Sequence, residues 1–213
     1  MAQRLKADVR DRILAAAATT FAASGYTRAT VAEIAEQADV TASNIYKYFE
    51  NKQVLFDAVV SPSHAGRLMR LLRTRMRELS SIGMWSSATA EGSEHAKALL
   101  SFWVEQRLPV LILLNGAQGT RYENVRARMT REMARQAEHF VHKHAPGEAD
   151  PHFSMVLQQI FANTVTMIAA ILERYESGAD IQHAFALFWS YQLAGLEALI
   201  KGRTPLAHRA EPH

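Results

Sequence analysis

A run of polar side chains between residues 41 and 48 has the types and spacing needed to contact nucleic acid. At helical spacing, Ser43, Asn44 and Lys47 share an outward face, with two tyrosines beside them. Asn and Lys hydrogen-bond to base edges in the DNA major groove, whereas Thr, Tyr and Lys commonly hold phosphates. We therefore interpret the segment as a DNA-binding surface, with these candidate contacts: Thr30, Thr41, Ala42, Ser43, Asn44, Tyr46, Lys47, Tyr48 and Lys52.

Two short helices joined by a tight turn must position this surface. Thr30 and Glu33 have the spacing of a capping box that opens the first helix, and Asp39 suits the left-handed turn that ends it. Thr41 then caps the second helix, whose Ile45 points inward. The pattern predicts a helix-turn-helix, in which the second helix enters the major groove. A purely structural helical hairpin is the alternative, but its surface would more often carry Glu and Lys pairs.

Lys52 begins the next predicted helix, at a position where a positive charge opposes the helix dipole. The same helix end attracts anions through its free N–H groups. We expect Lys52 to contact a phosphate. Ser43, Asn44 and Lys47 are then the candidates for base-edge contacts, and the threonines and tyrosines fix the register on the backbone.

The run GYTRATVAEIAEQADVTASNIYKYFENKQVLFDAVV closely resembles the N-terminal domain of TetR-family transcriptional regulators, and IYKYFENK is its most distinctive part. The resemblance covers about the first quarter of the chain. It departs from the family at Asp39, where Gly is usual, and at Asn44, where Thr or a small residue is usual. The resemblance implies a helix-turn-helix head, a ligand pocket in the remaining helices and dimerisation through the last two long helices. It does not transfer a base preference.

Composition narrows the remaining possibilities. The 213 residues contain no cysteine, which excludes a disulfide framework and thiol chemistry. The charged N-terminus lacks the apolar stretch of a signal peptide, and the longest apolar run, residues 109–114, is too short to span a bilayer. We expect a cytoplasmic protein without a membrane partner. Residues 1–60 carry seven basic and seven acidic side chains, which argues against a protein that coats DNA without sequence preference.

The hydrophobic periodicity predicts an all-α chain with two domains. We expect a helix-turn-helix DNA-binding domain over residues 1–56 and a larger helical ligand-binding and dimerisation domain over 57–203. Residues 204–213 form a tail that we expect to be disordered. Within the larger domain, Ser61-Pro62 opens a helix that runs to about residue 79, and its five arginines (67, 70, 73, 75 and 77) are interpreted as a solvated face. Thr120 and Glu123 predict a second capping box, and Pro109 predicts a break.

The last two predicted helices, over residues 152–176 and 180–201, are apolar on two faces. A helix with two apolar faces needs two partners, so we expect a second copy of the chain to cover one of them. The alternative is a central helix inside the monomer. A two-fold dimer predicts a near-palindromic DNA operator with half-sites roughly 34 Å apart, or a multiple of that spacing.

Large apolar side chains with a few polar ones in the middle helices are candidates for a small-molecule pocket. The candidates are Trp85, Phe102, Trp103, Asn115, Gln118, Tyr122, Met129, Met133, Gln159, Phe161 and Asn163. No cofactor is predicted, since the sequence has no glycine-rich phosphate loop and no paired-cysteine site. His139, His142 and His144 are interpreted as surface histidines rather than metal ligands.

These observations favour a sequence-specific transcriptional regulator, most simply a repressor that an unknown small-molecule effector releases from its operator. The alternative is a small-molecule-binding or enzymatic helical protein whose hairpin is only structural. The sequence contains no recognisable catalytic constellation, which counts against an enzyme. The effector, the operator sequence and the choice between repression and activation are not encoded in any motif found here.

Overall fold

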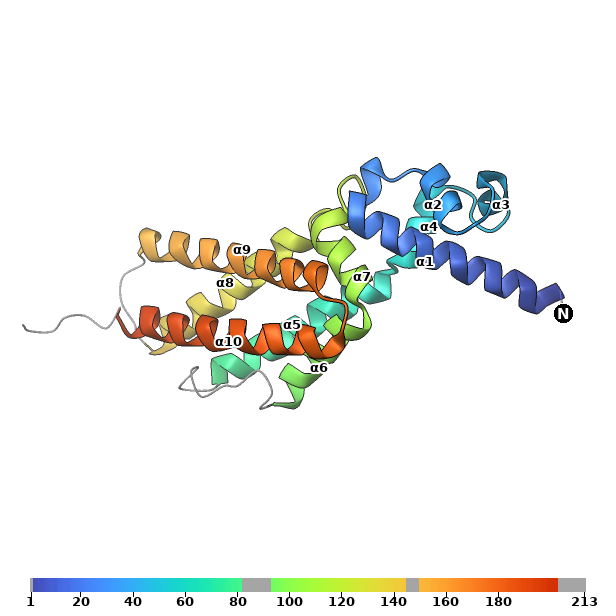
Figure 1. The fold of residues 1–213 in the computed structure, drawn as a ribbon. Helices are drawn as coiled ribbons and strands as arrows, with labels where there is room; N and C mark the ends of the chain where they lie inside the picture. Colours follow the sequence, from blue (N-terminus) through green and yellow to red (C-terminus); the bar gives the residue numbers. More distant parts are fainter. Residues whose placement is uncertain (1, 82–92, 145–149, 203–213) are drawn as a thin grey trace, which may run out of the picture.

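The computed structural model describes residues 2–81, 93–144 and 150–202, and these form a head and an elongated body (Figure 1). All regular elements in the described ranges are helices, as predicted. Four of them make the head: α1 (Ala2–Arg28), α2 (Val31–Gln37), α3 (Ala42–Tyr46) and α4 (Lys52–Val59). The expected tail, residues 204–213, lies outside the described residues.

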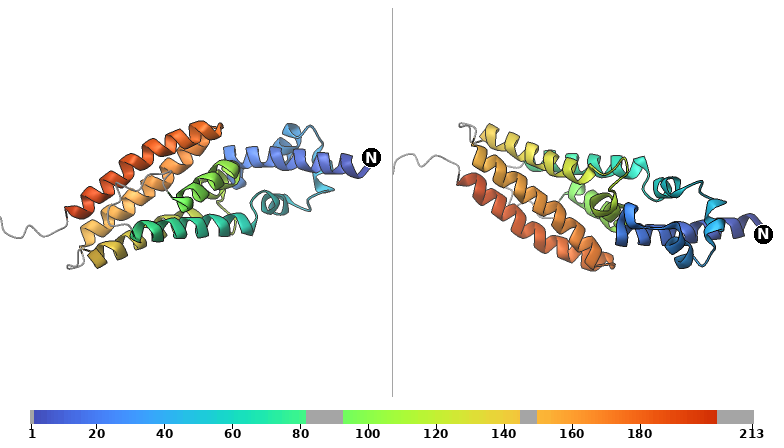
Figure 2. Two further views of the ribbon diagram at one scale, coloured as in Figure 1. Left: turned by 90° about the horizontal axis from the view of Figure 1, so that it is seen from below. Right: turned by 90° about the horizontal axis from the view of Figure 1, so that it is seen from above.

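The body begins where α4 ends and contains the remaining helices. Two views from opposite sides show α5, α8, α9 and α10 running along its length, with α6 and α7 packed inside and across one end (Figure 2). The elements are α5 (Pro62–Ser81), α6 (Glu94–Glu105), α7 (Arg107–Leu111), a π-helical turn η2 (Ile112–Gly116), α8 (Val125–His144), α9 (Pro151–Arg174) and α10 (Gly178–Lys201).

Gly25 ends the regular part of α1. Its backbone is left-handed (φ 75°), a conformation that glycine adopts without a Cβ clash. The chain can therefore reverse and place Tyr26 beside Phe56, with ring centroids 5.1 Å apart. Phe21 packs edge-on against the same Phe56 ring at 5.1 Å. This aromatic cluster fastens α4 to α1 and supports the short helices between them.

Two predicted boundaries in the body are wrong. The helix expected from Thr120 begins at Val125, because the Thr120 hydroxyl donates to the carbonyl of Ala117 (2.7 Å) and accepts from the amide of Tyr122 (3.1 Å). These bonds stabilise a turn in place of a capping box. Pro109 does not break the chain either. It lies in the first turn of α7, where its missing N–H costs no helical bond, and the break falls at Gln106.

The junction between head and body is a close backbone contact. η2 packs against α1, and a Cβ built on Gly116 would lie 2.8 Å from the carbonyl oxygen of Phe21 and 3.3 Å from Cα of Gly25. Next to it, Arg121 forms a 3.0 Å ion pair with Asp57 of α4. Tyr122 also lies 6.3 Å from Phe56, measured between ring centroids. Head and body are therefore joined by packed side chains and by the α4–α5 connection.

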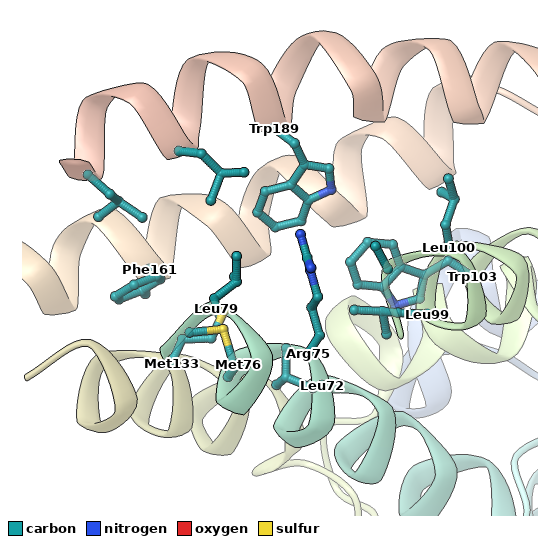
Figure 3. Close-up of a pocket in the computed structure, with 13 residues that line it drawn as sticks. Leu72, Arg75, Met76, Leu79, Leu99, Leu100, Trp103, Met133, Phe161 and Trp189 are labelled. Atoms are coloured by element: carbon teal, nitrogen blue, oxygen red, sulfur yellow. The ribbon is translucent and has the colours of Figure 1, made fainter. Parts of the chain in front are cut away.

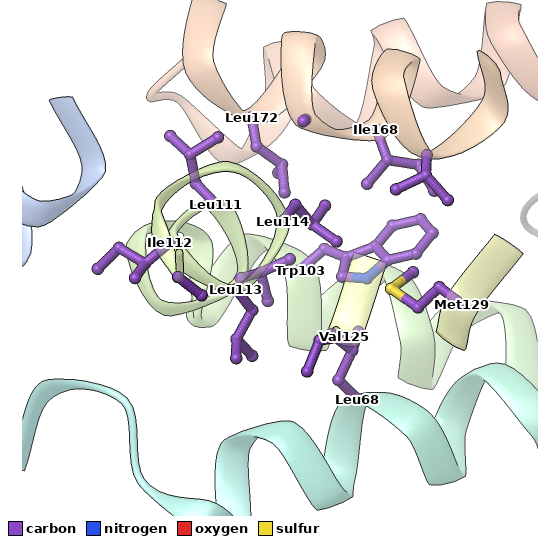
Figure 4. Close-up of a cluster of buried hydrophobic side chains, with 14 of the residues drawn as sticks. Leu68, Trp103, Leu111, Ile112, Leu113, Leu114, Val125, Met129, Ile168 and Leu172 are labelled. Atoms are coloured by element: carbon purple, nitrogen blue, oxygen red, sulfur yellow. The ribbon is translucent and has the colours of Figure 1, made fainter. Parts of the chain in front are cut away.

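Apolar side chains from most of the body helices form its core around the fully buried Trp103 of α6 (Figure 4). Met129 of α8 and Ile168 of α9 lie close to the indole in this view. Among single helices in the described residues, only α9 is long and apolar enough by composition to cross a membrane. α9 packs against α8 and buries a face that includes Phe161 and Val165, so its apolar composition is that of a core helix.

Candidate functional site

The helix-turn-helix is held in place by side-chain caps at each helix start. The Thr30 hydroxyl accepts from the amide of Glu33 (3.2 Å), and the Glu33 carboxylate accepts from the amide of Thr30 (2.9 Å). These bonds lower the pKa of Glu33. Thr41 caps α3 by accepting from the amide of Asn44 at 3.2 Å. The predicted capping box is confirmed, and both short helices begin where the sequence indicated.

Asp39 occupies the turn between α2 and α3 with φ 52°, and it is the one non-glycine residue with positive φ in the described ranges. Asp tolerates this left-handed conformation better than most residues do. Arg12 of α1 reinforces the turn by donating to the carbonyl of Ala38 at 3.1 Å, and it lies 3.9 Å from the Asp39 carboxylate. Behind the turn, Ile45 is fully buried. The backbone direction of α3 is thus set from both ends.

The proposed DNA contacts gather on and beside α3. Tyr46 is 52% exposed although its side chain is a large aromatic ring. The others divide into two groups by burial: Thr30, Thr41, Ser43 and Lys47 are exposed, whereas Ala42, Asn44, Tyr48 and Lys52 are half-buried. The arrangement offers hydroxyl, amide, phenol and ammonium groups on one short helix and its flanks. These groups can donate hydrogen bonds to phosphates and to base edges.

Lys52 has a structural role that the sequence did not indicate. Its Nζ donates to the carbonyls of Tyr26 (2.8 Å) and Ala29 (3.0 Å), and it lies 4.5 Å from the centre of the Tyr26 ring. The side chain therefore ties the start of α4 to the chain reversal after α1. One N–H of the ammonium group is left for another acceptor, so a phosphate contact by Lys52 stays a prediction.

A cavity of about 50 Å³ lies in the body between α5, α6, α8, α9 and α10 (Figure 3). Its walls are almost entirely apolar, and Arg75 is the one charged side chain among the described residues that line it. The lining comprises Leu72, Arg75, Met76, Leu79, Ala96, Leu99, Leu100, Trp103, Met133, Phe161, Trp189, Leu193 and Leu196.

Three of the predicted pocket residues, Trp103, Met133 and Phe161, line this cavity. The others do not: Phe102 packs under Arg67 at 5.0 Å, Met129 lies in the core, and Tyr122 lies at the junction. Trp85 lies outside the described residues.

The predicted polar candidates also lie elsewhere. Asn115 and Gln118 are exposed and line a separate polar groove beside the end of α1. Gln159 and Asn163 are on the exposed face of α9, where the Gln159 amide donates to Asn163 at 3.0 Å. Gln159 and Asn163 face solvent from the outward side of α9, and the Asn115 side chain accepts a hydrogen bond from Arg126 at 2.7 Å.

The prediction missed the contributions of α5 and α10, and above all Arg75. Arg75 was grouped with four neighbouring arginines as a solvated face, yet it is only 8% exposed. Spacing is the signal that could have found it: positions 68, 72, 75 and 79 share one face of a helix, and the other three are leucines. Three of the other arginines (67, 70 and 77) are exposed, as predicted, and Arg73 is half-buried.

Arg75 is held by a small polar network at the rim of the cavity. Its Nη1 donates to the Glu78 carboxylate (2.6 Å) and to the hydroxyl of Ser93 (3.1 Å). Ser93 in turn donates to Glu78 (2.8 Å) and caps α6 through the amide of Ala96 (3.0 Å). Burial alone would raise the pKa of Glu78, but the hydrogen bonds from Arg75 and Ser93 outweigh it and the pKa is lowered. The network fixes the direction of the guanidinium.

The described residues contain no group of three or more His, Cys, Asp or Glu side chains able to hold a metal ion. His139 and His142 are exposed on α8, and the side chain of His144 lies outside the described part.

The head is similar to a known protein family. Residues 13–59 match the family model described as "Bacterial regulatory proteins, tetR family". No curated protein sequence matches the chain. Sixteen chains of solved structures match; one is described as "Structural analysis of fatty acid degradation regulator FadR from Bacillus halodurans". It is 17% identical, with 84% of this chain and 97% of that chain covered, at a TM-score of 0.36.

Proposed function

We propose that the chain, whose residues 13–59 match the tetR family model, is a DNA-binding transcriptional regulator that acts as a homodimeric repressor in the cytoplasm. A small molecule bound in the body cavity releases it from a near-palindromic operator. The domain limits proposed are residues 1–56 for DNA binding and 57–203 for ligand binding and dimerisation. The observation that carries the proposal is the capped, outward-facing helix α3 on the side of the head away from the body (Figure 1).

In this proposal α3 enters the major groove by its N-terminal end. Ser43, Asn44 and Lys47 contact base edges, because all three carry hydrogen-bonding groups and only Asn44 is half-buried, the other two being exposed. The remaining candidates hold phosphates and thereby set the register of the helix in the groove. The fixed turn at Asp39 supports this assignment, since a helix that reads bases must be held in one orientation.

The proposed dimer forms through α9 and α10, and the partner is a second copy of the chain. Leu187 and Tyr191 of α10 are 63% and 76% exposed, and Met167 of α9 is 43% exposed. Small residues continue the α10 stripe: a Cβ on Gly195 would meet nothing within 4 Å, and Ala194 and Ala198 are exposed. Large apolar and small residues at helical spacing suit close packing of two helices on their counterparts across a two-fold axis.

Release requires the ligand to bind better to the state whose two heads are wrongly spaced for DNA. α5 supports this coupling, because it lines the cavity with Leu72 and Met76 and is joined to α4 of the head by only two residues, Val60 and Ser61. A shift of α5 would move α4 and, through Phe56 and Asp57, the contacts with the junction. α4 is therefore the proposed lever between the cavity and the DNA-binding surface.

The test is DNA binding measured by fluorescence anisotropy at two salt concentrations. The probes are the fragment upstream of the gene that encodes the chain and a scrambled fragment, followed by a selected pool of random sequences. Lys47→Ala/Tyr48→Ala should lose selective binding while keeping its helicity. Leu187→Glu/Tyr191→Glu should sediment as a monomer and bind the full operator at least tenfold more weakly, whereas Gln182→Glu on the same helix should leave both properties unchanged. Failure to select any sequence from the pool would overturn the proposal.

A further inference from the structure

Arg75 is unusual because it places a permanent charge in an otherwise apolar cavity. The side chain is 8% exposed, and its guanidinium points into the cavity between Trp103 and Trp189 (Figure 3). Burial of a charge without partners on all its donors is costly. A structural role alone would be met by Nη1, which donates the hydrogen bonds to Glu78 and Ser93.

The other edge of the guanidinium is available to a ligand. No described residue accepts a hydrogen bond from Nε or Nη2 of Arg75. These two groups present parallel N–H bonds in a fixed fork, and the matching acceptor is a planar group with two oxygens. The fork faces the cavity, because Glu78 and Ser93 hold the opposite edge at the rim.

We propose that the effector is a monocarboxylic acid with an apolar body, whose carboxylate binds the Nε and Nη2 edge of Arg75. This inference rests on the proposed function and names the chemical class of its ligand. The apolar body lies against Leu72, Met76 and Phe161, on the apolar walls of the cavity. Inside the protein, a charge-assisted pair of hydrogen bonds is stronger than a bond to a neutral hydroxyl or ester. The acid is therefore preferred over its alcohol.

The size of the cavity sets a condition on binding. About 50 Å³ is far below the roughly 300 Å³ at which small-molecule sites begin, so a ligand must push the walls apart. Met76 and Met133 are suited to this, because methionine side chains repack at low cost. The wall that carries both Arg75 and Met76 is α5, so a bound acid acts directly on the helix that follows α4 of the head in the chain.

The experiment uses two matched probe pairs, octanoate with octanol and 4-phenylbutyrate with 4-phenylbutan-1-ol. Binding to the full-length protein is followed by tryptophan fluorescence, because Trp103 and Trp189 flank Arg75, and by calorimetry. At least one acid should bind the wild type tenfold or more tightly than its alcohol. Arg75→Met should abolish this preference, Arg75→Lys should reduce it, and Arg77→Met, an exposed position on the same helix, should leave it unchanged.

Several results would overturn the inference: equal binding of acid and alcohol, binding of none of the four probes, or a preference that survives in Arg75→Met. If Arg75→Met does not fold, Arg75→Lys decides, since it keeps the charge and loses the fork. Operator binding is measured on the same samples without any probe. Selective DNA binding with no acid preference would reject the carboxylate effector and leave the regulator intact. An acid preference without selective DNA binding would reject the regulator instead.

Discussion

The head and the cavity are built in opposite ways. The proposed DNA-binding surface comes from one continuous stretch, residues 30–52, in which each helix start is capped by a side chain three residues before the amide it binds. The cavity is assembled from five helices between residues 72 and 196. The head exposes polar groups on a rigid local frame, whereas the cavity buries one charged group in apolar walls. Local bonds therefore determine the head, and packing between distant segments determines the cavity.

The junction joins the head to the body, and a substitution there should cause the largest loss of stability. Gly116→Ala places a Cβ 2.8 Å from the backbone oxygen of Phe21, which cannot move without shifting α1. We expect the free energy of unfolding to fall by about 3 kcal/mol, measured by urea denaturation. The control is Gly66→Ala, whose Cβ meets only the flexible end of Arg70 at 3.3 Å and which should be neutral or stabilising. Equal stability of the two variants would mean that head and body are not held by this contact.

Two lysines of the head differ in role. Lys52 donates hydrogen bonds to backbone carbonyls of the head, whereas Lys47 lies exposed on its surface. Lys52→Ala leaves the carbonyls of Tyr26 and Ala29 without their donor, so we expect a loss of about 2 kcal/mol in unfolding free energy. If Lys52 contacts a phosphate, Lys52→Ala should also flatten the dependence of log K on log salt by about one unit.

The matched variant is Lys47→Ala, at an exposed position of the same head. It should leave the unfolding free energy within about 0.5 kcal/mol of the wild type while weakening DNA binding. If Lys52→Ala lowers stability but leaves the salt slope unchanged, Lys52 is not a phosphate contact and serves the frame alone.

Glu78 gives the smallest effect and tests the cavity rim. Its pKa is below the ordinary value of 4.5 in the folded protein, so its contribution to stability is present above that pH and is lost as the pH falls further. Glu78→Gln should cost about 1 kcal/mol at pH 7, and the difference from the wild type should shrink below pH 4.5. Thermal unfolding at pH 7 and pH 3.5 measures this, with the exposed Glu123→Gln as control. A difference that does not change with pH would contradict the role of the ion pair.

The contrast also explains how much could be predicted from the sequence. Caps, turns and helical periodicity act over three or four residues, so Thr30, Asp39 and Thr41 were placed correctly from their neighbours alone. The cavity depends on which faces of distant helices meet. Polar candidates such as Asn115 and Gln159 were chosen by residue type, and they face solvent.

Arg75 shows the same limit from the other side. Its residue type suggested a solvated face, and only its register with three leucines indicated burial. The network with Glu78 and Ser93 joins positions up to 18 apart in the chain, so it follows from the packing of α5 against α6.

The glycine contact at the junction has a consequence for modular use of the protein. A side chain on Gly116 would collide with the backbone of α1 at Phe21, whereas Gly25 is required there for its left-handed backbone. A hybrid regulator that joins this head to the body of another protein must therefore have a glycine at the position of Gly116. Without it, the two domains cannot pack against each other. Exchange of ligand-binding domains between such regulators should therefore succeed when the residues on both sides of this contact are exchanged together.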